Sequence, residues 1–423
     1  MSKRRQKEIV VPPAGGLIWL VALFELLAFG LLSLQEGEGI DFLALGIGAV
    51  TVAILLIQYM ALTRFFPDLD VSILVIANVL AGLGIILQYR LGVDVAIKQT
   101  QWYAISMACM CIALVLVRLV RNWSPLVYGY MLAGLALLAL AAFFGIEEGG
   151  SRNWFAFAGV SFQPSEFVKV LLVFILASVL SKKRGFLHLA PLGGFLLAAV
   201  LLLVIQKDLG AAVLYFVTAL ILIYVGTSDV LLIGGALGAG VLGAIGSYHL
   251  FGHVRTRVEI WKNPWAAPLD SGYQIVQSLI AIASGGLFGL GLGLGLPRSV
   301  PAYRTDFIFA VICEEFGQII GIAVILLYLV LVMRGIIIAL RAHSRFDAIL
   351  SYGCVTMIAL QTFLIIGGVI KMIPLTGVTL PFVSYGGSSM VTNMVFIGVM
   401  QGIVLKNAAN ARRRADEAEF YEE

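Results

Sequence analysis

Charged residues that could bind an anionic ligand are concentrated in one long stretch between apolar segments. Residues 251–305 contain five cations, whereas most of the surrounding chain is apolar. These cations are Arg255, Arg257, Lys262, Arg298 and Arg304. Loops longer than about 15 residues are usually functional or disordered, and the Trp, Tyr, Ile and Leu content of this one predicts an ordered, functional loop. A negatively charged ligand is the simplest account of the cations, and contact with anionic lipid head groups is the alternative.

A second charged pair lies within an apolar segment that begins near residue 164. Ionisable groups at membrane depth are costly and usually functional. Pro164 suits the first turn of a helix, where the helix dipole favours Glu166. Glu166 and Lys169 are three residues apart, so they share a helix face and can pair. The pattern predicts either a charged wall of an outward-facing cavity or a structural ion pair between helices.

Further polar residues stand at the ends of apolar segments. Asp208, which follows Lys207, fits an N-cap at a helix start as well as it fits a ligand contact. Asp306 has the position of a cap at the outer end of its segment. Glu314 and Glu315 would lie about 12 Å deeper at a helical rise of about 1.5 Å per residue, so they must face protein or water rather than lipid.

Several motifs do not support cofactor or metal chemistry. The glycine run 289–295 has no preceding strand and no βαβ context, so we expect a flexible or tightly turned loop rather than a nucleotide site. The four His residues have no metal-ligand spacing, and the four Cys lie in apolar runs, where small buried residues are the better interpretation. Ser384 and Tyr385, after two prolines, predict a broken, polar start to the last apolar segment.

The composition is that of a membrane protein. The chain has 423 residues, of which 61% are hydrophobic and 12% charged, and nothing in it suggests nucleic-acid binding. Crossing the bilayer takes about 20 apolar residues. We therefore expect an all-α polytopic membrane protein with about twelve transmembrane helices and a long extracytoplasmic loop, 251–305, between the ninth and tenth. The expected spans are 15–34, 42–62, 71–88, 100–117, 125–144, 164–181, 190–206, 208–226, 229–250, 306–333, 346–370 and 385–405.

The distribution of Lys and Arg predicts the orientation. Cations are abundant at the N-terminus, in alternate short loops and in the tail, so the positive-inside rule places both termini in the cytoplasm. Residues 1–144 form the N-terminal spans, 145–405 the polar-rich core, and 406–423 a charged and partly disordered cytoplasmic tail. With this orientation, the polar loops and helix ends of the core lie on the outer side of the membrane. An outer cavity of this kind suits a lipid-linked anionic substrate, handled by an enzyme or by a transporter. Because the charges lie away from the membrane midplane, the enzyme is favoured.

At these residues the chain resembles the SEDS (shape, elongation, division, sporulation) family of RodA/FtsW-like peptidoglycan polymerases. The resemblance covers roughly 145–405, in the family's order and spacing. Its stretches are GGSRNWFAFAGVSFQPSEFVKV (149–170), QKDLG (206–210), RVEIWKNPWAAPLDSGYQIVQSLIAIASGGLFGLGLG (257–293), TDFIFAVICEEFG (305–317) and PLTGVTLPFVSYGGSS (374–389). The family commonly has three spans before the QPSE segment, whereas five are expected here, so residues 1–144 would include two extra helices.

The resemblance implies polymerisation of lipid II at the outer face of the bacterial plasma membrane, with release of undecaprenyl pyrophosphate and a class B penicillin-binding protein as partner. It implies a carboxylate base for the attacking sugar hydroxyl, and cations that stabilise the leaving pyrophosphate, with or without a divalent ion such as Mg or Mn. The residues that it places at the substrate are Arg152, Trp154, Glu166, Lys169, Lys207, Asp208, Arg255, Arg257, Tyr273, Gln274, Asp306, Ser384 and Tyr385.

The chain departs from the family pattern within the long loop 251–305. The resemblance places the family's catalytic Asp at Ala267, and Asp270 stands three residues later, where Gly is usual. Ala cannot accept a proton, so three alternatives follow. Asp270 has taken over as catalytic base; or the protein is an inactive scaffold for its transpeptidase; or it binds or flips a lipid-linked precursor without polymerising it.

Overall fold

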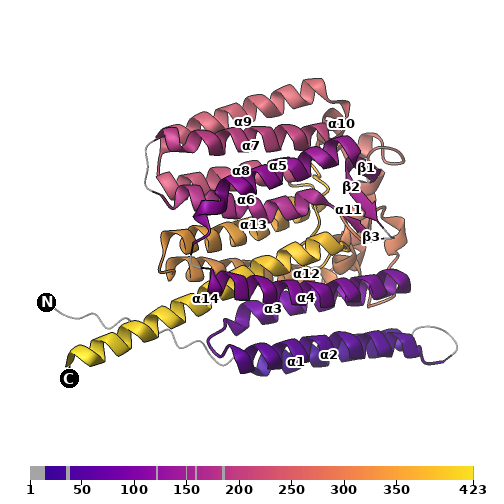
Figure 1. The fold of residues 1–423 in the computed structure, drawn as a ribbon. Helices are drawn as coiled ribbons and strands as arrows, with labels where there is room; N and C mark the ends of the chain where they lie inside the picture. The colour runs from indigo at the N-terminus through magenta and orange to yellow at the C-terminus, as the bar shows by residue number, and fades with distance from the viewer. Residues whose placement is uncertain are drawn as a thin grey trace.

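A computed structural model describes residues 15–34, 39–120, 122–148, 150–157, 160–182 and 186–422. Long helices stack side by side into a bundle (Figure 1). They are α1 (Gly15–Ser33), α2 (Phe42–Phe65), α3 (Val71–Leu91), α4 (Val93–Leu119), α5 (Val127–Phe144), α6 (Pro164–Leu180), α7 (Ala190–Ile205), α8 (Leu209–Thr227), α9 (Val230–Leu250), α12 (Ile308–Leu340), α13 (Arg345–Val369) and α14 (Gly387–Glu422). Within the described residues, ten helices are long and apolar enough to cross a membrane.

The polytopic helical class is thus confirmed, while the count of twelve spans stays a prediction. Each expected span coincides with one described helix, but α6 and α7 are shorter than the other ten, with 17 and 16 residues. The segments expected at 190–206 and 208–226 form two separate helices, α7 and α8, which pack on each other. Lys207 in their connection has a positive φ of 61°.

Aspartates fix where several helices begin. The carboxylate of Asp70 accepts hydrogen bonds from the backbone N–H groups of Ser72 and Ile73. Asp41 and Asp229 cap α2 and α9 in the same way. Each cap satisfies N–H groups that have no partner within the helix. Because Asp does this by local geometry, these helix starts follow from the sequence alone.

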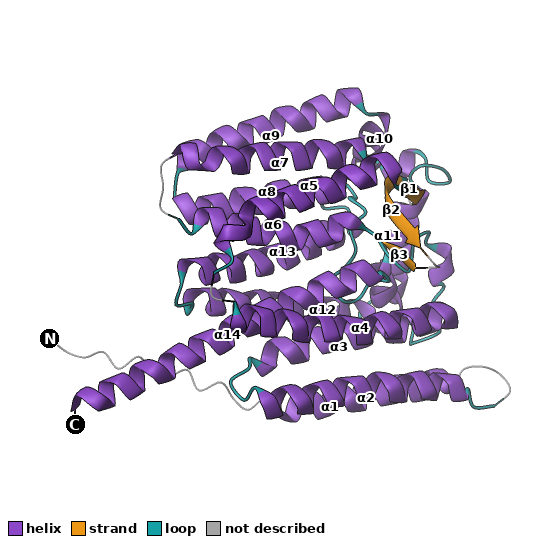
Figure 2. Ribbon diagram, viewed as in Figure 1, coloured by secondary structure: helices purple, strands orange, loops and turns teal. Residues whose placement is uncertain are grey.

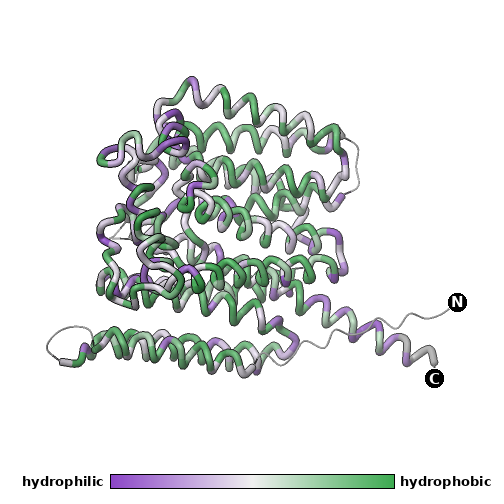
Figure 3. Tube along the Cα trace, turned by 180° about the vertical axis from the view of Figure 1, so that it is seen from behind, coloured by the Kyte–Doolittle hydropathy of each residue, from purple (hydrophilic) through white to green (hydrophobic). Residues whose placement is uncertain are grey.

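The centre of the bundle consists of α3, α13 and the first part of α14, where most residues are buried. The first part of α14 packs along α4 and also against α6 and α13. In contrast, no residue of α9 is buried, and this helix lies at one side of the bundle (Figure 1). Hydrophobic residues dominate the helices, as Figure 3 shows, and hydrophilic ones are more frequent toward the ends.

The two ends of the bundle differ. At one end lie α10 (Gly252–Lys262), α11 (Tyr273–Gly285) and a small antiparallel sheet (Figure 2). The sheet has the order β1 (Ile146–Glu148), β2 (Ser151–Phe157) and β3 (Val160–Phe162), and was not expected from the sequence. We call this the loop end. At the opposite end α1 begins and α14 finishes (Figure 1). Residues 406–422 continue α14 as a helix, so the expectation of a partly disordered tail is wrong for these residues.

The glycine run is a tight turn held against a break in α12. Gly317 interrupts that helix with φ 86°. Leu290 and Gly291 donate hydrogen bonds to the carbonyls of Glu314 and Glu315, at 2.9 Å each. A Cβ on Gly289, where φ is 83°, would lie 2.3 Å from the Glu315 carbonyl oxygen, so the contact excludes a side chain. The tightly turned alternative is therefore confirmed.

The two glutamates at this break also bind the loop with their side chains. Glu314 accepts from the N–H of Leu296 at 3.0 Å, and Glu315 from the N–H of Gly293 at 3.2 Å. Both glutamates are buried. They face protein rather than lipid, as the sequence required.

Candidate functional site at the loop end

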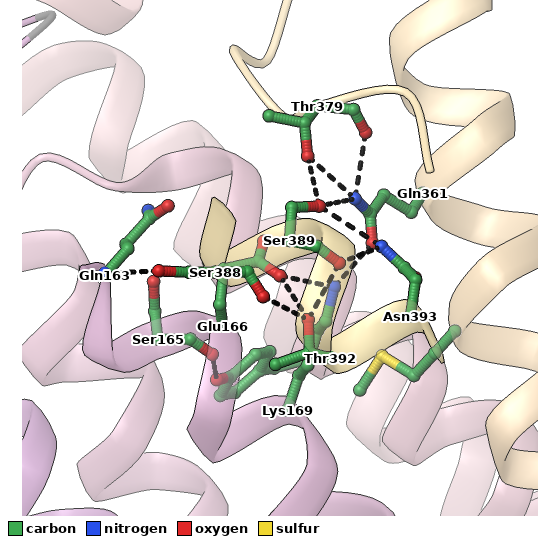
Figure 4. A network of polar contacts seen from close by, with 12 residues as sticks. Gln163, Ser165, Glu166, Lys169, Gln361, Thr379, Ser388, Ser389, Thr392 and Asn393 are labelled. Carbon is green, nitrogen blue, oxygen red and sulfur yellow. Dashed lines mark hydrogen bonds and ion pairs between the residues drawn. The ribbon is translucent and has the colours of Figure 1, made fainter. Parts of the chain in front are cut away.

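A buried ion pair is the centre of a polar network near the loop end (Figure 4). The ammonium of Lys169 lies 2.6 Å from a carboxylate oxygen of Glu166 and donates to the side-chain oxygen of Gln361 at 2.9 Å. The hydroxyl of Thr392 donates to the same Glu166 oxygen at 2.8 Å. The pair therefore joins α6 to α13 and α14. The expected pairing of Glu166 with Lys169 is confirmed, whereas its role, structural or toward a substrate, stays a prediction.

The network continues into residues 370–386, which precede α14. The side-chain nitrogen of Gln361 donates to the carbonyl of Thr379 at 2.8 Å. The hydroxyls of Thr379 and Ser389 are 2.6 Å apart, and Asn393 donates to the Ser389 carbonyl at 2.8 Å. Polar groups in an apolar interior are stable only when hydrogen-bonded. The network thereby holds this irregular segment over the ion pair, as Figure 4 shows.

Asp208 ties the sheet to α6 and α8. One carboxylate oxygen accepts from Asn153 at 2.6 Å, Gln163 at 3.2 Å and Ser165 at 3.2 Å. The other accepts from the N–H of Ala211 at 3.0 Å, which makes Asp208 the N-cap of α8. Burial raises the pKa of Asp208 above its ordinary value, although the hydrogen bonds act in the opposite direction. The expected cap is confirmed.

A cation and an acid flank the segment 375–377. Arg257 of α10 donates to the carbonyls of Leu375 and Thr376 at 3.2 and 3.0 Å. A Cβ built on Gly377 would lie 3.6 Å from a carboxylate oxygen of Asp306 and 3.9 Å from the guanidinium of Arg257. Burial raises the pKa of Asp306 to about 6, while its bond to Thr305 and the charge of Arg257 act to lower it. A positive and a negative group thus border the same small space.

Ser384 and Tyr385 help to fix this region rather than extending into solvent. The hydroxyl of Ser384 donates to the carbonyl of Thr305 at 2.6 Å and accepts from the N–H of Leu380 at 2.8 Å. The N–H of Tyr385 donates to the carbonyl of Arg304 at 2.9 Å. The segment before α14 is therefore bonded to the segment before α12, next to Asp306.

The remaining candidate cations lie at the rim. The guanidinium of Arg152 donates to the carbonyl of Gly145 at 3.0 Å. Lys207 lies 3.6 Å from Glu147, and both side chains are more than half exposed, so this pair contributes little stability. Arg255 lies 5.7 Å from the ring of Tyr248. Trp154 is partly buried on β2. The structure thus leaves Arg152 and Lys207 open to solvent rather than joined to the Glu166–Lys169 pair.

Asp270 lies in an exposed turn just before α11. The carbonyl of Ala267 accepts from the N–H groups of Asp270 and Gly272, at 3.3 and 3.0 Å. A Cβ on Gly272 would lie 2.2 Å from the carbonyl oxygen of Pro264, which explains the glycine. Within the described residues the carboxylate of Asp270 has no ion pair with Arg152, Lys169 or Arg257.

Tyr273, which begins α11, is partly buried. Gln274, the second residue of α11, is exposed.

The sequence did not single out four members of the network: Asn153, Gln361, Thr392 and Asn393. A signal was present for three of them, since Gln361, Thr392 and Asn393 are polar residues within apolar spans. No such signal marked Asn153, because its burial depends on strand β2, which was not expected from the sequence.

The described protein groups at the loop end do not make a metal site by themselves. Among the described residues, no group of three His, Cys, Asp or Glu is placed to hold a metal ion. The carboxylate of Glu166 already binds Lys169 and Thr392, and that of Asp208 accepts four hydrogen bonds.

Comparison with known proteins identifies the family. The family model for the FtsW/RodA/SpoVE group, described as cell cycle protein, matches residues 64–409. The peptidoglycan glycosyltransferase RodA of Mycobacterium tuberculosis is 33% identical over 434 residues, which cover 95% of this chain and 91% of that protein. The stage V sporulation protein E of Bacillus subtilis is 38% identical over 293 residues, 67% of this chain and 79% of that protein.

Solved structures share the fold. One, from a peptidoglycan synthase complex that coordinates polymerization and crosslinking, has a TM-score of 0.65 at 24% identity, covering 80% of this chain and 98% of that chain. The rod shape determining protein RodA of Thermus thermophilus has a TM-score of 0.50 at 26% identity, covering 85% of this chain and 95% of that chain. The resemblance read from the motifs is thus confirmed, and this chain belongs to the FtsW/RodA/SpoVE (SEDS) family of polytopic membrane proteins.

Proposed function

We propose that this protein is a peptidoglycan glycosyltransferase that polymerises lipid II at the outer face of the bacterial plasma membrane, in elongation, division or sporulation. The observation that carries the proposal is the gathering of the Glu166–Lys169 pair, Asp208, Arg257 and Asp306 at one end of the bundle. Named relatives that match most of the chain are peptidoglycan glycosyltransferases. The proposal places the loop end outside and both termini in the cytoplasm.

In the proposed reaction, the sugar 4-hydroxyl of one lipid II attacks the anomeric carbon of the growing chain. A new C–O bond forms, the bond to the pyrophosphate oxygen breaks, and undecaprenyl pyrophosphate leaves with the bonding electrons. A carboxylate accepts the hydroxyl proton. Arg257 and the exposed rim cations Arg152, Lys207 and Arg255 stabilise the pyrophosphate charge that develops. Lys169 holds the Glu166 carboxylate in place through their ion pair.

Asp270 is the proposed base. Its exposed carboxylate, on a turn fixed by Ala267 and Gly272, is free to meet a substrate that enters from the outer side. Asp306 is another outer carboxylate, and it borders the same space as the cation Arg257, so the test must separate Asp306 from Asp270.

The protein residues do not fit a resident divalent ion, because the described residues offer no three-ligand set. A Mg or Mn ion would have to arrive with the substrate pyrophosphate, since Mg usually binds through one or two carboxylates together with phosphate oxygens. No step of the reaction above depends on it.

A scaffold role is the second candidate. It is favoured by Ala267 at the position of the family's catalytic Asp and by the absence of any described ion pair to Asp270. In either role we propose a class B penicillin-binding protein as partner, in line with the coordination of polymerization and crosslinking in the related complex. Flipping of a lipid-linked precursor is a third activity, tested by translocation in liposomes.

The test is glycan synthesis from lipid II by the purified protein with its partner. We expect the wild type to make glycan chains and Asp270→Ala to lose this activity by at least about 100-fold, the lower range for loss of a general base. Asp94→Ala is the matched control, since Asp94 is an exposed acid at the same end, outside the loop. Asp306→Asn reports on the other acid.

Each outcome decides between the candidates. Full activity of Asp270→Ala together with loss in Asp306→Asn would transfer the role of base to Asp306. No product from the wild type, but product from Ala267→Asp, would show that the natural protein is a scaffold.

A further inference from the structure

A cavity of about 200 Å³ lies at the end of the bundle opposite the loop end. It is formed where α6 finishes and where α5 and α7 begin. Its polar lining includes Ser124, Ser178, Lys182 and His188. None of these residues belongs to the site described above, which lies at the other end of the same helices (Figure 1).

Two buried polar atoms in the lining have no hydrogen-bond partner among the described residues. They are the hydroxyl oxygen of Ser178 and the Nε2 atom of His188. Ser178 is only 1% exposed, and a buried hydroxyl without a partner is costly. Other buried hydroxyls in the helices of this protein bond back to a carbonyl one turn earlier, as Thr51 and Thr100 do. Ser178 does not, so its hydroxyl is left for a ligand in the cavity.

The electrostatics of the cavity favour an anion. Lys182 contributes an ammonium group, and the first turns of α5 and α7, the positive ends of their helix dipoles, lie at the wall. The negative end of α6 acts in the opposite direction, but three of its last carbonyls already accept hydrogen bonds. Ser181 donates to the carbonyls of Ala177 and Ser178, and Lys182 donates to that of Val179.

We infer that this cavity binds a phosphate group at the membrane boundary, held by the Ser178 hydroxyl, the His188 ring and the Lys182 ammonium. The volume is below the roughly 300–1,000 Å³ of pockets for drug-sized ligands, so it suits a phosphate with a small substituent rather than a nucleotide. The phosphate comes either from an anionic lipid head group or from solution. The inference is independent of the proposed glycosyltransferase activity.

The experiment uses the full-length protein in nanodiscs of neutral phosphatidylcholine. Thermal unfolding is followed while phosphatidylglycerol is added to the bilayer in one arm and inorganic phosphate to the solution in the other, at constant ionic strength. The probe that raises the unfolding temperature identifies the source of the phosphate. Its apparent affinity is then measured for Ser178→Ala and Lys182→Ala.

We expect Lys182→Ala to weaken binding of the effective probe about tenfold or more, as loss of a charged hydrogen bond does, and Ser178→Ala to weaken it less. Arg64→Ala is the matched control, because Arg64 is an exposed cation at the same end but outside the cavity. It should bind as the wild type does. Ser178→Ala should unfold near the wild-type temperature without ligand, which excludes misfolding. A wild type that responds to neither probe, or cavity variants that respond fully, would overturn the inference.

Discussion

Breaking the Glu166–Lys169 pair tests whether the network at the loop end depends on paired charge. In Lys169→Met the Glu166 carboxylate keeps its bond to Thr392 but loses the ammonium 2.6 Å away. Removing one partner of a buried pair costs about 3–5 kcal/mol. Since the Glu166 side chain is 13% exposed, we expect Lys169→Met to lower the free energy of unfolding by the lower limit of this range, about 3 kcal/mol. Gln361 also loses the donor to its side-chain oxygen.

The double variant Glu166→Gln/Lys169→Met removes both charges and keeps similar volumes. Its free energy of unfolding should lie within about 1 kcal/mol of that of the wild type, because replacing a whole buried pair is often neutral. Thermal unfolding in detergent is followed with a thiol-reactive dye, since Cys313 and Cys354 are buried until the protein opens. Glu166→Gln is also measured alone. If the losses of Lys169→Met and Glu166→Gln simply add in the double variant, the two charges are not coupled and the reasoning fails.

Three further predictions concern the loop end. Burial raises the pKa of Asp306 to about 6, above its ordinary value, so its ionisation opposes folding. The unfolding temperature should fall as the pH rises from about 4 to 6, and Asp306→Asn should reduce that fall; an unchanged profile would contradict it. Gly289→Ala, at φ 83°, should destabilise the protein by more than about 1 kcal/mol, whereas Gly243→Ala, which meets open space on α9, should not; equal unfolding temperatures would refute this. Asp208→Ala removes a cap and leaves Asn153 without its acceptor, so we expect a loss of about 2 kcal/mol or more; denaturation at the wild-type temperature would argue against it.

Much of the fold was predictable because it is local. Apolar runs of about 20 residues predict helices in a membrane whatever their neighbours are. Asp70 and Asp229 cap their own helices through hydrogen bonds only two or three residues away. The pairing of Glu166 with Lys169 likewise follows from a spacing of one helical turn. Family motifs then supplied the expected chemistry, which spacing alone left open between enzyme and transporter.

Only the tertiary structure decided which distant residues meet. Gln361 reaches Lys169 across 192 positions, and Thr392 reaches Glu166 across 226. No local pattern encodes such contacts, because they depend on which helix faces pack together. The break of α12 at Gly317 has the same origin, since the preceding carbonyls bond to a loop some 25 residues earlier rather than to their own helix. The sequence by itself therefore determined the helices, several of their caps and the family. The packing decided that Lys169 is buried in a network, that Asp208 holds the sheet, and that Asp270 remains exposed beside Ala267.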